Sequence, residues 1–375
     1  MRILFAGGGT AGHINPAIAI ADTIRAHDKN AEIAFIGTSY GLENDLVSKA
    51  GYPIYRIEMR GLKRSLSLSN VKTAYYYFTA PIKAKKLIKE FRPDVVFGTG
   101  GYLSWPLVKA ATMLGVPSAV HESNAIPGKA IRMLSGKVNR IYLNFPTAAE
   151  EIKEKEKIMV VGNPLISNGA IPRSPELEAK LGVEEGEFTV LSFGGSLGAD
   201  KLNKTVIAVA KMYESEHRRV LFVHSCGGRK YDDALKFARA AGAADCKNLR
   251  MMKYIYNMPE WEACADVVIS RAGAMTLSEL ALAGKAAVIV PSPYVANNHQ
   301  YENAKRLADA GAAIMIEEKD ITPELLKATL DELIGNDEKR RALCENIRAF
   351  SYPQAKERIY LDLCELAERS PFKSV

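Results

Sequence analysis

Short apolar runs that end in glycine alternate with longer amphipathic stretches, and this alternation starts twice along the chain. In the first half, the runs RILFAG, AEIAFIG and DVVFGTGG each precede a helix-like stretch. The segment FTVLSFGGSLGA starts the rhythm again at residue 188, and ADVVISRAGA continues it. Apolar runs of this kind indicate parallel strands covered by helices on both faces. The sequence therefore predicts an α/β protein with two Rossmann-like domains, parallel sheets facing a central cleft, and ligands at the carboxyl ends of the strands.

The domain boundaries are predicted from breaks in this pattern. Residues 162–186 carry Pro164, Pro172 and Pro175 and are typical of a linker. A last amphipathic stretch after Pro353 could pack on either domain, and we assign it to the first. We therefore expect an N-terminal domain of residues 1–162 plus 354–375 and a C-terminal domain of residues 163–353.

Length and composition favour a soluble protein with a sizeable core. The chain has 375 residues, of which 47% are hydrophobic, but no apolar run approaches the roughly 20 residues that span a bilayer. The start of the chain reads as a strand rather than a signal peptide. Five cysteines without C-x-x-C spacing argue against a disulfide framework or a zinc site and are typical of a reducing cytoplasm.

Positive charge is concentrated in residues 56–92. This segment holds ten lysines and arginines against Glu58 and Glu90, although the whole chain carries a net charge of only +7. Such a segment attracts an anionic surface or polymer. It also contains an apolar helical face, made of Val71, Ala74, Tyr75, Phe78 and Ile82. Lys72, Lys85 and Lys86 flank this face. This face either enters lipid headgroups or packs on the domain core, and the sequence leaves both interpretations open.

The opening loop GGGTAGH satisfies the G-x-G-x-x-G pattern of a dinucleotide site through Gly7, Gly9 and Gly12. A dinucleotide site also needs an acidic residue at the end of the second strand, and that strand ends at Gly37 and Thr38. The loop therefore indicates an anion site at a helix N-terminus, or simply close packing of the strand and the helix.

Three further segments point to phosphate and sugar recognition. GTGGY at 98–102 and GGSLGA at 194–199 are glycine loops at strand ends, and RAGAMTLSE at 271–279 begins a helix. In the last segment, Glu279 could accept two hydrogen bonds from a sugar diol. Its alternative role is to complement the helix dipole.

Taken in order, GGGTAGH, GTGGY, HESNAIPG, GGSLGA, RAGAMTLSE and NNHQYENA closely resemble the MurG family over about residues 3–360. The resemblance implies a GT-B glycosyltransferase fold and transfer of N-acetylglucosamine (GlcNAc) from UDP-GlcNAc to the C4 hydroxyl of lipid I, giving lipid II for peptidoglycan synthesis. It implies peripheral attachment at the cytoplasmic face of the cell membrane, through an anionic membrane surface. Proteins of cell-wall synthesis are further expected partners, and nucleic acid is not.

The resemblance also implies roles for individual residues. In the donor site it places Thr10, Ala11 and Gly12 in the first loop, Asn124 near the sugar, Ser196 at the diphosphate and Ile255 at uracil. Glu279 would bind the ribose and Gln300 the GlcNAc hydroxyls. The remaining donor-binding residues are expected to be Arg271, Ala274, Met275, Thr276, Leu277 and Ser278.

This chain departs from the family pattern at two places. Ala11 stands where the family often has glycine, and a methyl group is tolerated there if φ is negative. After Gly162-Asn163-Pro164 the family often has an arginine that helps to bind the donor, whereas this chain continues with Leu165 and Ile166. That contact is either lost or supplied by another residue.

The expected reaction is a single inverting displacement, which needs a base and a group that stabilises the departing UDP. His13 is our choice of base, because its ordinary pKa suits proton transfer near neutral pH; its alternative role is to orient the loop. Glu122 and His121 are alternative bases or positioning groups, and His121 could instead tie its loop through a backbone hydrogen bond. Tyr102 would contact the acceptor. Backbone N–H groups after Gly194, together with Arg271, would stabilise UDP without a cofactor or metal. Asp232 and Asp233 are adjacent rather than spaced as D-x-D, and we interpret them as solvated surface.

Other function classes remain as alternatives. A related GT-B enzyme that acts on another lipid differs only in its acceptor. A Rossmann oxidoreductase is disfavoured by the missing acidic residue after the second strand. A nucleic-acid-binding protein would use the basic segment but would leave the glycine loops unexplained.

Overall fold

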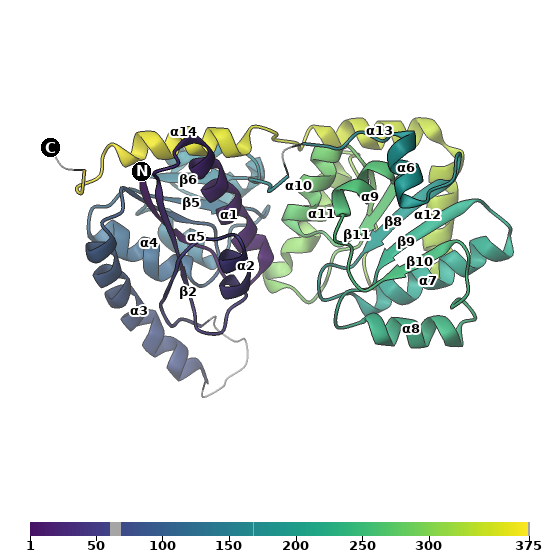
Figure 1. Cartoon of the computed structure of the whole chain (residues 1–375), viewed down its shortest axis with the longest axis horizontal. Helices are drawn as coiled ribbons and strands as arrows, with labels where there is room; N and C mark the ends of the chain where they lie inside the picture. Colours follow the sequence, from purple (N-terminus) through teal and green to yellow (C-terminus); the bar gives the residue numbers. More distant parts are fainter. Residues whose placement is uncertain (61–68, 168, 374–375) are drawn as a thin grey trace. The chain divides into compact units, whose positions relative to one another are not determined.

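The computed structural model describes residues 1–60, 69–167 and 169–373, and among residues 69–74 it describes only the side chain of Thr73. The chain forms two compact units. Unit 1 consists of Met1–Asn168 and Tyr352–Val375, and unit 2 consists of Gly169–Ser351 (Figure 1).

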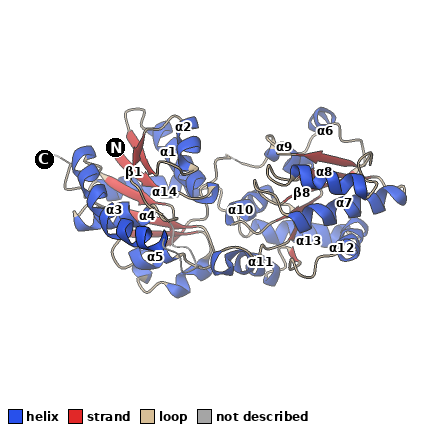
Figure 2. Cartoon of the chain, turned by 90° about the horizontal axis from the view of Figure 1, so that it is seen from below, coloured by secondary structure: helices blue, strands red, loops and turns tan. Residues whose placement is uncertain are grey.

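Unit 1 is built on a seven-stranded parallel sheet with the strand order β3-β2-β1-β4-β5-β6-β7. Helices cover both faces of this sheet (Figure 2). The elements in chain order are β1 (Arg2–Ala6), α1 (Ala11–His27), β2 (Glu32–Gly37), α2 (Glu43–Lys49), β3 (Ile54–Arg56), α3 (Ser69–Phe91), β4 (Val95–Gly98), α4 (Ser104–Met113), β5 (Ser118–Glu122), α5 (Lys129–Leu134), β6 (Arg140–Leu143), η1 (Pro146–Glu151), η2 (Lys155–Lys157), β7 (Ile158–Val160) and α14 (Ala355–Ala367).

Unit 2 repeats this plan with a six-stranded parallel sheet in the order β10-β9-β8-β11-β12-β13. Its elements are α6 (Pro175–Leu181), β8 (Phe188–Phe193), α7 (Asp200–Ser215), β9 (Val220–Ser225), α8 (Tyr231–Ala240), β10 (Leu249–Met252), α9 (Met258–Cys264), β11 (Val267–Ser270), α10 (Ala274–Ala283), β12 (Ala286–Ile289), η3 (Ala296–Asn298), α11 (His299–Asp309), β13 (Ile314–Met315), α12 (Pro323–Gly335) and α13 (Asp337–Arg348). In both units the strand order reverses beside the first strand, which is where doubly wound sheets bind ligands.

The central strands are apolar because both of their faces are covered. In β1, Ile3 and Phe5 contribute to one core cluster and Leu4 and Ala6 to another, and all four side chains are fully buried. Alternate side chains of a strand point to opposite faces, so each cluster lies on one side of the sheet. Burial on both sides explains why these strands read as continuous apolar runs.

Helix α14 belongs to unit 1 although it follows the whole of unit 2 in the chain. Figure 1 shows it running along α1, and its Ile359 and Leu363 side chains are buried in the same cluster as Ile20. The carboxylate of Asp362 accepts hydrogen bonds from Arg140 at 2.8 Å and from the Tyr142 hydroxyl at 2.6 Å. A partly buried ion pair and a buried hydroxyl therefore fix this helix to β6.

The boundary between the two units, at residues 168 and 169, lies within the stretch 162–186 that was expected to link the domains, but residues 175–181 of this stretch form α6. Ser174 caps this helix, since its side chain accepts a hydrogen bond from the Leu177 N–H at 3.2 Å. Pro175 follows at the first helical position, where a missing N–H does no harm. One of the prolines that indicated a linker, Pro175, therefore begins a helix.

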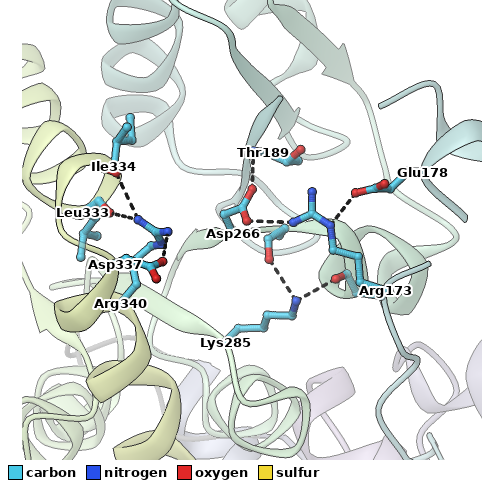
Figure 3. A network of polar contacts seen from close by, with 11 residues as sticks. Arg173, Glu178, Thr189, Asp266, Lys285, Leu333, Ile334, Asp337 and Arg340 are labelled. Carbon is cyan, nitrogen blue, oxygen red and sulfur yellow. Dashed lines mark hydrogen bonds and ion pairs between the residues drawn. The ribbon is translucent and has the colours of Figure 1, made fainter. Parts of the chain in front are cut away.

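A polar network anchors the start of unit 2 to the amino ends of its strands (Figure 3). Arg173 forms ion pairs with Glu178 at 2.6 Å and with Asp266 at 2.8 Å. Asp266 also accepts a hydrogen bond from the Thr189 N–H at 2.8 Å. Because Asp266 immediately precedes β11, Arg173 lies at the edge of the sheet opposite to the carboxyl ends of the strands.

Candidate functional site

The ring of His13 lies against the glycine loop that follows β4. A Cβ atom on Gly100 would come within 2.7 Å of His13 Cδ2, and Gly100 has a φ of +99°, so a side chain at this position would both clash and be strained. Thr99 Oγ1 donates a hydrogen bond to the His13 carbonyl at 2.5 Å. The GTGGY segment therefore holds His13 in place by packing against its ring and by a hydrogen bond to its backbone carbonyl.

The hydrogen bonds of His13 indicate which ring nitrogen can act as a base. His13 Nδ1 lies 3.3 Å from the Gly8 carbonyl oxygen and 3.2 Å from Thr10 Oγ1. The Thr10 hydroxyl can donate to Nδ1 or accept from it, whereas a carbonyl oxygen can only accept, so a hydrogen bond to Gly8 places the proton on Nδ1 in the neutral ring. Nε2 is then the nitrogen that can take up a proton.

Glu43, a buried carboxylate that sequence reasoning missed, lies beside the first glycine loop. Glu43 is fully buried and accepts hydrogen bonds from the Thr38 N–H at 3.0 Å, from Thr38 Oγ1 at 2.9 Å and from the Gly9 N–H at 3.4 Å. A carboxylate at this place repels phosphate and uses an N–H group that a phosphate would need. The first loop is therefore unsuited to a dinucleotide, which argues against the oxidoreductase alternative.

The other residues expected in the first loop lie at its surface. Thr10 is exposed and adopts an extended backbone before α1, and Ala11 and Gly12 are half-buried in the first turn of the helix. Ala11 lies outside the residues with positive φ, so its methyl group is accommodated.

Tyr102 packs its ring against Gly9, and burial together with the nearby Glu43 carboxylate raises the pKa of its hydroxyl to about 12. Tyr102 is therefore protonated and is a hydrogen-bond donor rather than a base.

Glu122 is buried and organises the HESNAIPG loop. One carboxylate oxygen accepts hydrogen bonds from the Asn124 N–H at 2.9 Å and from Asn124 Nδ2 at 3.0 Å, and the other accepts from the Gly128 N–H at 2.7 Å. Burial raises its pKa, and these hydrogen bonds oppose that shift. This geometry favours a positioning role for Glu122, with Asn124 held at the loop surface.

His121 is fully buried, with Nε2 at 3.0 Å from the Gly162 carbonyl oxygen. Burial lowers its pKa to about 4. These contacts favour the role of tying strand β5 to the Gly162 turn over that of a base.

In unit 2, a cavity of about 620 Å³ opens at the carboxyl ends of the strands. Segments that follow β8, β9, β11, β12 and β13 all contribute to its wall. Its lining includes the expected donor residues Arg271, Thr276 and Gln300 and also the glycine loop of GGSLGA. The lining residues that the sequence did not single out include Asp200, Lys201, Lys230, Ser292, Tyr294 and Glu318.

The glycine loop of this cavity is held by close backbone contacts. A Cβ atom on Gly198 would come within 2.1 Å of the Cys226 carbonyl oxygen, and the φ of Gly198 is +81°. The exposed Ser196 accepts a hydrogen bond from the Gly228 N–H through its carbonyl at 3.0 Å. Helix α7 starts directly after the loop, so its N-terminal N–H groups and dipole favour an anion in the cavity.

Arg271 lies in the cavity wall but has partners within the protein. It forms an ion pair with Glu318, and both side chains are nearly buried. It also donates hydrogen bonds to the carbonyls of Val290 at 3.1 Å and Pro291 at 3.3 Å. Gln300 Oε1 accepts a hydrogen bond from the Ser292 N–H at 2.9 Å, which orients the amide N–H₂ group.

Helix α10 carries the remaining expected donor residues. Ala274, Leu277 and Ser278 are buried, whereas Met275, Thr276 and Glu279 are half-buried. Burial raises the pKa of Glu279 to about 7. Glu262 of α9 is close enough to sense its charge, and burial first and Glu279 second raise the pKa of Glu262 to about 8. The two helices thus bring together two acidic groups with raised pKa values.

Ile255, expected at uracil, is buried in the loop between β10 and α9. Its neighbours Tyr254 and Tyr256 are exposed, and their rings lie 4.9 Å apart in a T-shaped arrangement. The loop therefore presents aromatic surface on both sides of Ile255.

Helix α3 exposes the apolar face that the sequence analysis singled out. Tyr75, Phe78 and Ile82 are 63%, 72% and 67% exposed. The core-packing interpretation is therefore wrong for these three side chains. Ala80, Ala84 and Ile88 face the core instead, and Tyr77 stacks on Trp105 with ring centroids 5.0 Å apart. Lys85 is half-buried and Lys86 is exposed, whereas the side chains of Val71, Lys72 and Ala74 are outside the part of the chain that the structure describes.

The described part of the chain contains no cluster of three or more His, Cys, Asp or Glu side chains that could hold a metal ion. Asp232 and Asp233 lie in the first turn of α8. Within the same residues, no helix has both the length and the apolar character needed to cross a bilayer.

The chain is similar to known proteins over nearly its whole length. The models of the Glycosyltransferase family 28 N-terminal and C-terminal domains match residues 3–143 and 189–359. A Thermoanaerobacter sp. (strain X514) protein is 39% identical over 360 residues, which are 96% of this chain and 98% of that protein. A Bacillus subtilis (strain 168) protein is 37% identical over 366 residues, or 98% and 99% of the two chains.

Both relatives are named UDP-N-acetylglucosamine--N-acetylmuramyl-(pentapeptide) pyrophosphoryl-undecaprenol N-acetylglucosamine transferase. Among solved structures, Acinetobacter baumannii MurG matches with a TM-score of 0.77 and 28% identity. The match covers 97% of this chain and 99% of that one.

Proposed function

Because the chain belongs to the MurG family of glycosyltransferases, we propose that it transfers GlcNAc from UDP-GlcNAc to lipid I and so forms lipid II. Lipid I is the undecaprenyl-pyrophosphoryl-N-acetylmuramyl-pentapeptide named in its relatives. The observation that carries this proposal is the cavity of unit 2, where Arg271, Thr276 and Gln300 meet a glycine loop and a helix N-terminus. This combination suits a sugar nucleotide, because it offers N–H groups for phosphate and side-chain amide and hydroxyl groups for the sugar.

Unit 1 supplies the base in the proposed mechanism. His13 Nε2 takes the proton from the C4 hydroxyl of the acceptor while that oxygen forms its bond to C1 of GlcNAc. The bond between C1 and the β-phosphate oxygen breaks, and UDP leaves with the electron pair. Attack on the face opposite to the leaving group converts the α linkage of the donor into a β linkage.

Unit 2 holds the donor during this step. The N–H groups of the Gly194–Gly198 loop and of the first turn of α7 stabilise the negative charge that grows on the departing diphosphate. Glu279, when ionised, accepts hydrogen bonds from the ribose diol, and the amide of Gln300 contacts the GlcNAc hydroxyls. In this proposal no divalent cation takes part.

Attachment to the cytoplasmic face of the membrane is proposed for α3 of unit 1. Tyr75, Phe78 and Ile82 form an exposed apolar stripe. The basic residues Lys85, Lys86 and Lys89 follow on the next turns of the helix. Apolar side chains enter the headgroup region, and each lysine near an anionic surface contributes about 1 kcal/mol. Such attachment brings the enzyme to an acceptor that is itself anchored in the bilayer.

A transfer assay with radiolabelled UDP-GlcNAc and a lipid I analogue tests the function. We expect label in the lipid product both with EDTA and with added Mg²⁺. A second arm with diacylglycerol as acceptor should give no labelled lipid. Transfer to diacylglycerol instead of lipid I would assign the chain to another lipid acceptor, and loss of transfer in EDTA would contradict the metal-free mechanism.

A further inference from the structure

The donor cavity of unit 2 contains three cationic side chains, and two of them already have strong partners. Arg271 is paired with Glu318 and donates to two backbone carbonyls. Lys201 donates to the carbonyls of Glu318 and Lys319. Arg271 and Lys201 are therefore already bonded to groups of the cavity wall.

The third cation, Lys230, has a weak intramolecular partner. Its ammonium group lies 3.9 Å from the carboxylate of Asp233, and both side chains are about half exposed. A charge-assisted hydrogen bond between such groups measures 2.7–2.9 Å, so this contact is at most a loose ion pair. An exposed pair of this kind contributes little to stability.

The backbone fixes Lys230 beside the glycine loop. A Cβ atom on Gly198 would lie 3.0 Å from the Cβ of Lys230, and the Gly228 N–H donates to the Ser196 carbonyl at 3.0 Å. The side chain of Lys230 therefore starts in contact with the loop and lines the cavity.

The position of Lys230 in its own helix is electrostatically unfavourable. It is the N-cap residue of α8, where the positive end of the helix dipole disfavours a cation. Asp232 and Asp233 in the first turn compensate the dipole. The lysine itself thus adds positive potential to a place that already favours anions.

No arginine follows Gly162-Asn163-Pro164 in this chain, and the next arginine, Arg173, is held elsewhere. Arg173 forms ion pairs with Glu178 and Asp266 at the amino ends of the strands of unit 2 (Figure 3). The cavity lies at the carboxyl ends of the same strands. Arg173 is therefore not available to the diphosphate.

We propose that Lys230 binds the diphosphate of the nucleotide donor and supplies a cation that no other described side chain of the cavity wall is free to supply. This inference rests on the proposed function, since it takes the cavity as the UDP-GlcNAc site. The ammonium group acts together with the N–H groups of the Gly194–Gly198 loop and shares the charge of the departing UDP.

The test measures binding of UDP and of uridine to the purified full-length protein and to Lys230→Gln by calorimetric titration. We expect the variant to bind UDP about tenfold more weakly and uridine as tightly as the wild type does, because uridine has no phosphate. Lys230→Arg should restore most of the UDP affinity. The melting temperature of Lys230→Gln should equal or exceed that of the wild type, since a cation leaves the positive end of α8.

Arg229→Gln is the matched control, because Arg229 is the exposed neighbour of Lys230, carries the same charge and does not line the cavity. An equal loss of UDP affinity in this control would overturn the proposal, as would unchanged UDP binding by Lys230→Gln or an equal loss of uridine binding. A wild-type protein that binds no UDP would overturn the donor-site assignment itself.

Discussion

The ring of His13 is held by contacts that decide which of its nitrogens is basic. A hydrogen bond to the Gly8 carbonyl favours the proton on Nδ1, and the backbone at Gly100 packs against the ring. A histidine that is oriented through one nitrogen and reactive through the other is the usual arrangement of a general base. The same geometry makes the role of His13 testable.

Replacement of His13 by alanine should reduce the rate of GlcNAc transfer about 100-fold or more while leaving UDP binding unchanged. The reason is that the proton acceptor is lost in unit 1, whereas the donor cavity lies in unit 2. The rate is measured by the radiolabel assay and UDP binding by calorimetry. His27→Ala is the control from the same helix, because His27 pairs with Glu357 and stacks on Tyr360. Wild-type turnover by His13→Ala would rule out the base assignment.

Glu262 is a buried acid whose charged form is costly. Its side chain is 6% exposed, and one carboxylate oxygen is buried with no hydrogen-bond partner. Burial raises its pKa from 4.5 to about 8, so the folded protein retains a proton that the unfolded chain releases between these values. Stability that is present below about pH 4.5 is therefore lost as the pH rises through 8.

Glu262→Gln should stabilise unit 2 at pH 8 by about 2 kcal/mol and have little effect at pH 5, because glutamine has no proton to lose. Thermal unfolding at both pH values measures this difference. Glu260→Gln on the same helix is the control, since Glu260 is paired with Lys180 and its pKa is lowered. A stabilisation of equal size at pH 5 and pH 8 would contradict the titration of Glu262.

At this scale the sequence predicted residue types better than their contacts. His13, Arg271, Thr276 and Gln300 were singled out, and the structure gives the first a supported ring and places the others in one cavity. Glu43 was missed because its interaction with Gly9 joins two segments that no local pattern relates. Lys230 was missed for the same reason, since only the fold brings it to Gly198.

Among the elements, α3 has two apolar faces, and the helical pattern alone cannot show which of them is buried. Both faces are apolar, and only packing against α4 decides that Ala80, Ala84 and Ile88 are buried. The sequence identified the other face, Tyr75, Phe78 and Ile82, and left its role open. Its exposure favours the interaction with lipid.

A triple variant with Tyr75, Phe78 and Ile82 replaced by serine should bind vesicles of anionic phospholipid at least tenfold more weakly, because the apolar stripe no longer enters the headgroups. Cosedimentation with vesicles measures the binding. Leu361→Ser on α14 provides the control, since Leu361 is 60% exposed but lies outside the stripe. Undiminished cosedimentation of the triple variant would remove α3 from the membrane interface.

For the whole molecule, the repeated strand, glycine loop and helix pattern was sufficient to predict two parallel sheets. The order of the strands was not available from it, because order depends on which strands pair in space. The last helix was assigned to the first domain and does belong to unit 1, although the pattern itself was compatible with either domain. Arg140 and Tyr142 contact this helix at Asp362, which follows them by 222 and 220 residues in the chain.

Asp362→Ala should destabilise unit 1 by about 3 kcal/mol, because it leaves the Arg140 guanidinium and the buried Tyr142 hydroxyl without their acceptor. UDP binding by unit 2 should persist at temperatures at which unit 1 has unfolded. Thermal unfolding, with UDP binding measured in parallel, checks both expectations. The exposed residue Glu368, also near the end of α14, gives the control variant Glu368→Ala. Equal stability of the Asp362 variant and the control would show that the contacts of Asp362 with Arg140 and Tyr142 contribute nothing.

The return of α14 to unit 1 has a consequence for biosynthesis. Residues 169–351 leave the ribosome before the helix that completes unit 1, so unit 2 can finish folding first. Until α14 emerges, the surface of α1 that includes Ile20 lacks its cover of Ile359 and Leu363. Apolar surface of the nascent first unit therefore stays uncovered during the synthesis of the entire second unit.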